Sequence, residues 1–252
     1  MTHEPRRGQW QQTYTGRSFF PLDARAEEID VRDIAHALAC QNRFAGHTRV
    51  PYSVGEHSVR CGRYVRSVFR ARYPHASAEH ERQAVLAALL HDATEAYLVD
   101  LPRPVKVEMP DYQRAEARLA GVVEAWAGLP RGALEWAIVK EADEALLATE
   151  KRDLMGPSQR PWGRLATPLT EEIEPWYWQR AEAEFLALYG ELCASLGAAP
   201  SHYHGCPACY EKLPCTLDCT VFEREDGVGL GGFEACAGCK ASGAGAAAAE
   251  EP

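Results

Sequence analysis

The sequence has 252 residues, of which 46% are hydrophobic and 25% charged, and this composition excludes collagen-like, low-complexity and wholly disordered proteins. Its formal net charge of −9 argues against a broad nucleic-acid-binding face, although a small anionic ligand needs only a few local cations. The first ten residues lack the apolar core of a secretory signal, and the central apolar run Ala84–Leu90 is far shorter than the ~20 residues of a membrane span, so we expect a cytoplasmic protein.

The first four fifths of the sequence have helical periodicity and almost no alternation of the kind found in strands. Ser53 and Glu56 have the spacing of a capping box, which marks the start of a helix. Pro102 and Pro104 must end the apolar helix before them, because proline does not fit a helix interior. The sequence therefore predicts an all-α bundle with helices at Ile29–Cys40, Ser53–Phe69, Glu79–Tyr97, Asp111–Trp126, Arg131–Leu154 and Pro175–Leu196.

Four residues on three of these helices form a candidate metal site. His91 and Asp92 follow the apolar run AVLAALL, where an unpaired charge is costly. His57 lies on the apolar stripe of its own helix, and Asp143 lies on an apolar face of another. Two imidazoles and two carboxylates suit a divalent transition ion that keeps open positions for water. A His-Asp pair alone more often reflects a capped or salt-bridged residue, but the burial and the matching partners favour the metal.

The order of several segments identifies a known family. Arg43-Phe44 is followed by SVGEHS (Ser53–Ser58), HDATEAY (His91–Tyr97), DLPRPVK (Asp100–Lys106) and EADEALLATEKRDL (Glu141–Leu154). From about residue 13 to 196, the chain resembles the small bacterial and phage branch of the HD-domain phosphohydrolases. That branch includes 5′-deoxynucleotidases of the YfbR and YfdR type and the DatZ-type dATP triphosphohydrolase.

The resemblance implies a role for each matching residue. His57, His91, Asp92 and Asp143 would hold one divalent metal, with Co, Mn, Zn, Fe and Mg not distinguished, and a homo-oligomer is expected. Glu95 would position or deprotonate the attacking water. Arg43 and Lys106 would hold phosphate. Phe44 would pack against the sugar or base, and Asp100 would contact the ribose. Three positions depart from the family: Gly55 replaces a usual Ala, Glu56 replaces a common Gln, and Val99 replaces a Gly before the aspartate.

These features predict a divalent-metal-dependent phosphohydrolase of deoxynucleotides, in which water attacks the phosphate next to the 5′ carbon. One alternative is a dNTP or dATP triphosphohydrolase that uses the same site. Another is a catalytically silent HD-domain binding module that docks through its cysteine-rich tail; the presence of all four ligands and Glu95 argues against it. A cyclic-nucleotide or alarmone hydrolase would share the ligands, but the Arg43-Phe44 and Asp100–Lys106 segments point to the nucleotidase branch.

Six of the nine cysteines lie in the tail, which divides the chain near Gly197. Two Cys-x-x-Cys pairs predict a structural zinc module similar to a zinc ribbon, because such density in a reducing compartment indicates metal binding. Cys215 and Cys219 are left open as ligands. A redox role is disfavoured because no βαβ pattern surrounds the pairs. The predicted parts are a flexible N-terminus (1–12), the HD-domain body (13–197), the zinc-ribbon-like module (198–240) with ligands Cys206, Cys209, Cys236 and Cys239, and a disordered tail (241–252).

Overall fold

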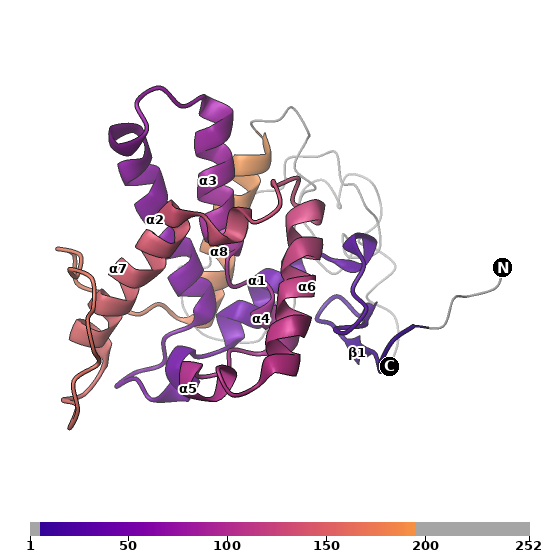
Figure 1. The fold of residues 1–252 in the computed structure, drawn as a ribbon, viewed down its shortest axis with the longest axis horizontal. Coiled ribbons are helices and arrows are strands. Elements are labelled where there is room, and N and C mark those ends of the chain that lie inside the picture. The colour runs from indigo at the N-terminus through magenta and orange to yellow at the C-terminus, as the bar shows by residue number, and fades with distance from the viewer. Residues whose placement is uncertain (1–5, 195–252) are drawn as a thin grey trace, which may run out of the picture. The chain divides into compact units, whose positions relative to one another are not determined.

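The computed structural model describes residues 6–194, and these residues form a bundle of helices preceded by a short hairpin (Figure 1). The expected all-α class is confirmed. The two short strands β1 and β2 pair antiparallel, with Gln11 opposite Phe19. In chain order the elements are β1 (Gln11–Gln12), β2 (Ser18–Phe19), η1 (Ala26–Glu28), α1 (Val31–Cys40), η2 (Arg43–Gly46), α2 (Val54–Arg72), α3 (Ala78–Leu90), α4 (Glu95–Leu98), α5 (Arg103–Lys106), α6 (Pro110–Trp126), η3 (Ala133–Glu135), α7 (Ala137–Leu154) and α8 (Trp178–Ala194).

Helix α2 occupies the centre of the bundle, because it packs against α1, α3 and α7. Figure 1 shows α2 and α3 running side by side, with α7 next to α2. The apolar face of α2 includes Val65 and Phe69, both fully buried. Gly55 allows close packing of α2 on α1, since a Cβ built there would lie 3.0 Å from the Ala39 backbone nitrogen. The sequence thus places the first turns of α2 in the interior of the protein.

The start of α2 confirms half of the predicted capping box. The Ser53 side chain accepts a hydrogen bond from the Glu56 amide at 3.0 Å, as expected of an N-cap. The Glu56 carboxylate, however, accepts from the Arg60 guanidinium and, at 2.7 Å, from the Trp176 amide, which leads into α8. The reciprocal half of the box is therefore wrong, because a buried arginine-paired carboxylate replaces the bond back to Ser53.

The predicted helix Glu79–Tyr97 is interrupted. Helix α3 ends at Leu90, and the chain passes through tight turns before α4 begins at Glu95. In these turns the amides of Ala93 and Glu95 donate to carbonyls three residues earlier, at 2.9 Å each. No glycine or proline marks the interruption, so propensity alone does not predict it. Likewise, the predicted helix 131–154 consists of η3 and α7, separated by Trp136 in an extended conformation.

Part of the N-terminal segment lies among the described residues, whereas the cysteine-rich C-terminal segment does not. Residues 6–12, the last part of the segment expected to be flexible, contact the body, since Arg6 pairs with Asp23 at 2.8 Å and with Glu28 at 2.6 Å. The predicted zinc module (198–240) and tail (241–252) lie outside the described residues and stay predictions. Among residues 6–194, no helix combines the length and apolar character that crossing a membrane requires.

Candidate metal centre

The four predicted metal ligands converge from three places in the chain. His57 comes from the second turn of α2, His91 and Asp92 follow α3, and Asp143 comes from α7. The Nε2 atoms of His57 and His91 lie 3.2 Å apart. His57 Nε2 lies 3.2 Å from Asp143 Oδ1 and 3.7 Å from Asp92 Oδ2, and His91 Nε2 lies 3.2 Å from Asp92 Oδ2. Two nitrogens and two oxygens therefore surround one point.

The outer ring nitrogens (Nδ1) of the two histidines each face a hydrogen-bond acceptor. His91 Nδ1 lies 2.8 Å from the Ala88 carbonyl, which can only accept, so this nitrogen carries the proton. His57 Nδ1 lies 2.6 Å from Glu150 Oε1, and an ionised carboxylate likewise only accepts. Both Nε2 atoms therefore face the cluster, and without a metal His57 Nε2 donates to Asp143 Oδ1 at 3.2 Å. Once that proton is lost, the same atom is placed as in an imidazole that ligates a metal while its other nitrogen bonds to a second partner.

The charges around the cluster keep its carboxylates ionised. Burial opposes ionisation of Asp92, but the positive charges of His91, His57 and Arg43 outweigh it and hold the pKa of Asp92 well below its usual range. Burial likewise opposes ionisation of Asp143, and its hydrogen bond to His57 leads the interactions that hold the pKa of Asp143 below its usual range. The cluster therefore holds two ionised carboxylates against the positive charge of His57 and Arg43, and loss of the Nε2 protons would leave two nitrogens and two carboxylates facing one point, which is the chemistry of a cation site.

Glu150 is a buried residue of this centre that sequence reasoning missed. Its side chain is fully buried on α7, where Oε1 accepts from His57 and Oε2 accepts from Arg43 Nε at 3.3 Å. Glu150 lies seven residues after Asp143, and this spacing places both carboxylates on one face of the helix. That spacing within the family-like segment is the signal that could have identified Glu150.

Arg43 lies against the cluster and is held by carboxylates. Besides Glu150, its guanidinium pairs with Asp92 at 3.2 Å and with Asp143 at 3.8 Å, and only 12% of the side chain is exposed. The three acidic partners fix the plane of the guanidinium at the edge of the site. Its predicted contact with phosphate stays a prediction.

Phe44 and Ala45 have strained backbones beside this arginine. Their φ values of 56° and 50° lie in the left-handed region, which costs a residue other than glycine about 1–3 kcal/mol. The Phe44 ring lies 5.4 Å from the Arg43 guanidinium and 6.0 Å from the Trp162 ring. Phe44 therefore lies between the Arg43 guanidinium and Trp162, an aromatic neighbour that the sequence did not single out.

Glu95, the predicted base, is buried beside the cluster. Within residues 6–194, its Oε2 atom has no hydrogen-bond partner. Burial, together with the negative charges of Asp92 and Asp100, raises the pKa of Glu95 well above its usual range. An unpartnered buried carboxyl whose pKa is raised by such neighbours is typical of a functional group.

Lys106 and Asp100 have local partners. Lys106 Nζ lies 2.5 Å from Glu116 Oε1 on α6, a partner not predicted from the sequence. The amide of Asp100 donates to the side chain of Gln41 at 3.2 Å. Asp100 follows Val99, whose φ of 70° is one that glycine adopts more readily, at the position where the related family has glycine. The loop keeps the glycine-like conformation despite the different residue.

Cys61 is a second neighbour of the cluster that the sequence did not reveal. It lies one turn after His57 on α2, and its Sγ atom is 3.5 Å from His57 Nε2. The potential ligand atoms of His57, Cys61 and His91 all lie within 4.8 Å of one another. Sequence periodicity assigned Cys61 to the apolar stripe, because free cysteine is among the most frequently buried residues.

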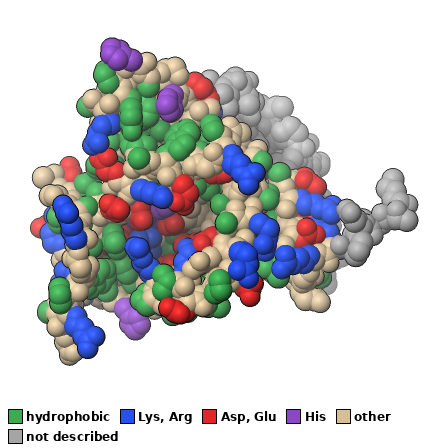
Figure 2. Space-filling view, in the orientation of Figure 1, with side chains coloured by type: hydrophobic (Ala, Val, Ile, Leu, Met, Phe, Trp, Pro, Cys, Tyr) green, Lys and Arg blue, Asp and Glu red, His purple; other side chains and the backbone are tan. Residues whose placement is uncertain are grey.

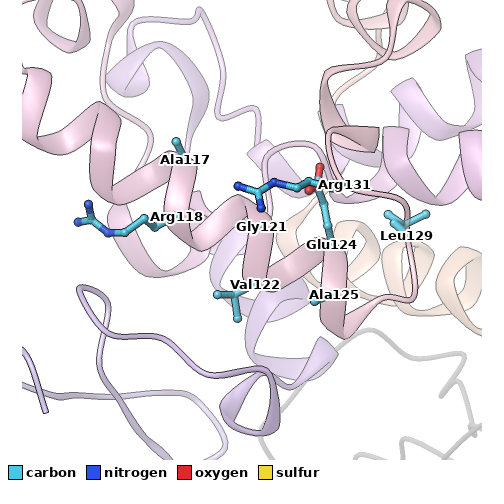
Figure 3. A pocket seen from close by; sticks show the side chains of 8 residues that line it. All are labelled: Ala117, Arg118, Gly121, Val122, Glu124, Ala125, Leu129 and Arg131. Carbon is cyan, nitrogen blue, oxygen red and sulfur yellow. The ribbon is translucent and has the colours of Figure 1, made fainter.

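The surface of the described residues has a charged hollow and a separate cavity. Figure 2 shows acidic and basic side chains gathered around a hollow in the middle of the displayed face. A cavity of about 550 Å³ lies along α6 and the loop after it, lined by residues that include Arg118, Val122, Leu129 and Arg131 (Figure 3). None of the predicted site residues lines this cavity, so it is separate from the metal cluster.

The predicted zinc ligands Cys206, Cys209, Cys236 and Cys239 lie outside the described residues, so the zinc module stays a prediction.

Comparison with known proteins places the chain in a family. Over 142 residues it is 38% identical to the uncharacterized protein YfdR of Escherichia coli K12, covering 56% of this chain and 70% of YfdR. Over 124 residues it is 39% identical to an uncharacterized protein of Rhodobacter capsulatus, covering 48% of this chain and 59% of that protein. No protein-family model matches the sequence. On the extent of its similarity to the E. coli protein, the chain belongs to the YfdR family.

Proposed function

We propose that this chain is a divalent-metal-dependent phosphohydrolase of the HD-domain type, acting on 5′-deoxynucleotides. The observation that carries the proposal is the arrangement of His57, His91, Asp92 and Asp143, whose acceptor atoms lie 3.2–3.7 Å apart and face one another. Without a metal these contacts are ion pairs and hydrogen bonds, such as the one from His57 Nε2 to Asp143 Oδ1. A divalent ion at the same point would replace the Nε2 proton and supply the positive charge that balances the two carboxylates.

The chemistry of the donors fits a transition ion. Imidazole nitrogens and carboxylate oxygens are ligands for Zn, Fe, Mn and related ions. Glu150 and the Ala88 carbonyl hold the outer nitrogens of the two histidines, which orients the inner nitrogens before an ion binds. When bound, such an ion lowers the pKa of a coordinated water and polarises a phosphoryl oxygen.

The remaining residues supply proton transfer and substrate binding in this proposal. Glu95 accepts a proton from the attacking water, a role that suits a carboxyl whose pKa is raised above its usual range by burial and by the negative charges of Asp92 and Asp100. Arg43 and Lys106 bring positive charge to the phosphate, with Lys106 exchanging part of its contact with Glu116 for the substrate. Phe44 offers a ring to the sugar or base, and Asp100 offers a carboxylate to the ribose. The expected homo-oligomer belongs to the proposal as well.

The experiment is product analysis by chromatography after incubation with dNMPs, dNTPs and ribonucleotides in the presence of Co²⁺, Mn²⁺ or Zn²⁺. Nucleoside and inorganic phosphate from dNMPs support a 5′-deoxynucleotidase, whereas products from dNTPs support the alternative triphosphohydrolase. Glu95→Gln should lower kcat by about 10²–10⁴-fold while metal binding persists. The exposed Glu144→Gln on α7 is the matched control. Absence of turnover in metal-loaded wild-type protein with every nucleotide would overturn the proposal and favour the binding module.

A further inference from the structure

We propose that Cys61 of helix α2 is a further ligand of the metal centre and that its sulfur makes the centre favour thiophilic ions. The inference rests on the metal site of the proposed function and adds a sulfur donor to it. The sulfur would join His57 and His91 on the buried side of the cluster, whereas Asp143 lies on its more exposed side, with 45% of its side chain accessible.

The fold directs the thiol at the metal-facing nitrogen of His57. His57 and Cys61 are four residues apart on α2, so their side chains leave the same face of the helix. The Sγ atom lies 3.5 Å from Nε2, the nitrogen that faces His91, and not from Nδ1, which is bonded to Glu150. Both side chains are fully buried, so α2 holds them in a fixed relation.

The observed separations match those of a common coordination shell. With zinc–nitrogen distances of ~2.0–2.1 Å and a zinc–sulfur distance of ~2.3 Å, tetrahedral geometry separates two nitrogens by ~3.3 Å and a nitrogen from a sulfur by ~3.6 Å. The corresponding separations are 3.2 Å between the two Nε2 atoms and 3.5 Å between His57 Nε2 and Cys61 Sγ. The third separation, between His91 Nε2 and Cys61 Sγ, is at most 4.8 Å, so small side-chain adjustments would let all three atoms share an ion.

A sulfur ligand changes which ions the centre prefers. Thiolate is a soft donor that favours Zn²⁺, Co²⁺ or Fe²⁺ over Mg²⁺ and Mn²⁺, which prefer oxygen. On ligation the S–H bond breaks, a sulfur–metal bond forms and one proton is released to solvent. Cys61 thereby acts as a specificity-determining ligand for the metal.

The test is the absorption spectrum of the Co²⁺-loaded full-length protein, compared between wild type and Cys61→Ser. A sulfur-to-cobalt charge-transfer band should appear in the difference spectrum, because contributions from the cysteines of the tail cancel. Cys61→Val, which keeps an apolar side chain of similar size, should lose the same band but retain Mn²⁺ binding, and the retained binding shows that the loss does not come from misfolding. Cys40→Ser, at an exposed cysteine of α1, is the control and should leave the band intact.

The outcomes separate this inference from the proposed function. Mn²⁺ affinity, measured by calorimetry, should stay close to the wild-type value in Cys61→Ser, since the four nitrogen and oxygen donors are retained. Mn²⁺ binding and turnover without a Cys61-dependent cobalt band would overturn the role of Cys61 and leave the phosphohydrolase standing. A Cys61-dependent band in a protein that hydrolyses no nucleotide would support the sulfur ligand and overturn the proposed function.

Discussion

Substituting Glu150 with glutamine removes one charge from beneath the metal centre and leaves the shape of the side chain unchanged. The two carboxylate oxygens of Glu150 accept from different donors, His57 Nδ1 at 2.6 Å and Arg43 Nε at 3.3 Å. The amide that replaces the carboxylate has only one oxygen, so its NH₂ group must face one of these N–H donors. While His57 keeps its Nδ1 proton, one buried contact becomes a repulsive pair of donors, and His57 can relieve it only by moving that proton to Nε2, the atom that faces the metal.

The expected size of this effect follows from the burial of the pair. Loss of a partner that orients a metal-ligating histidine weakens metal binding by about 10–100-fold, equal to roughly 1.4–2.7 kcal/mol. Without metal, the unsatisfied buried donor costs about 1–3 kcal/mol of unfolding free energy. In a chain of this size, a loss of that order lowers Tm by roughly 2–4 °C for each kcal/mol.

The assay is calorimetric titration with Mn²⁺, an ion that the cysteines of the tail bind poorly, together with thermal unfolding of the metal-free protein. Glu144→Gln, an exposed residue of the same helix, should leave both quantities unchanged. Wild-type Mn²⁺ affinity and Tm in Glu150→Gln would refute the argument that Glu150 orients His57.

Three further predictions concern packing, backbone strain and pH. Gly55→Ala should lower the free energy of unfolding by about 1 kcal/mol, because crowding against the Ala39 backbone outweighs the gain in helix propensity. Gly121→Ala, with nothing within 4 Å of the new Cβ, should raise the free energy of unfolding. Urea denaturation measures both effects. Val99→Gly should raise the free energy of unfolding by about 1 kcal/mol, because glycine relieves the strain of the positive φ. An unchanged denaturation midpoint would contradict the strain at this position. The pKa of Glu150 lies below its usual range, so its contribution to stability is present above the unfolded value of about 4.3 and is lost as the pH falls through the folded value. Denaturation at a series of pH values should therefore show a steeper loss of stability below about pH 4.3 in the wild type than in Glu150→Gln, and parallel curves would contradict it.

The sequence identified site residues where a polar or charged side chain falls at a position that the hydrophobic pattern predicts to be buried. A charged aspartate after AVLAALL and a histidine on an apolar stripe require partners, and the structure brings His57, His91, Asp92 and Asp143 together. Their positions follow from the 3.6-residue period, because each helix presents one face to the same interior. Their role as ligands stays a prediction.

The sequence was less informative about side chains that match their surroundings. Cys61 fits an apolar stripe as well as a ligand position, so only its distance to His57 reveals the second possibility. Glu150 reads as one more charge in a polar helix until its burial is known. The break after Leu90 arises from tertiary packing and the tight turns around Asp92, which no local propensity encodes.

The most direct test of the central claim is anomalous scattering from a crystal of the full-length protein grown with Zn²⁺. The account predicts a zinc peak about 2.0–2.1 Å from the Nε2 atoms of both His57 and His91, with carboxylate oxygens of Asp92 and Asp143 beside it. This measurement locates the ion and so separates it from zinc bound by the cysteines of the tail. A crystal whose zinc lies only at those cysteines, with none between the two histidines, would contradict the account.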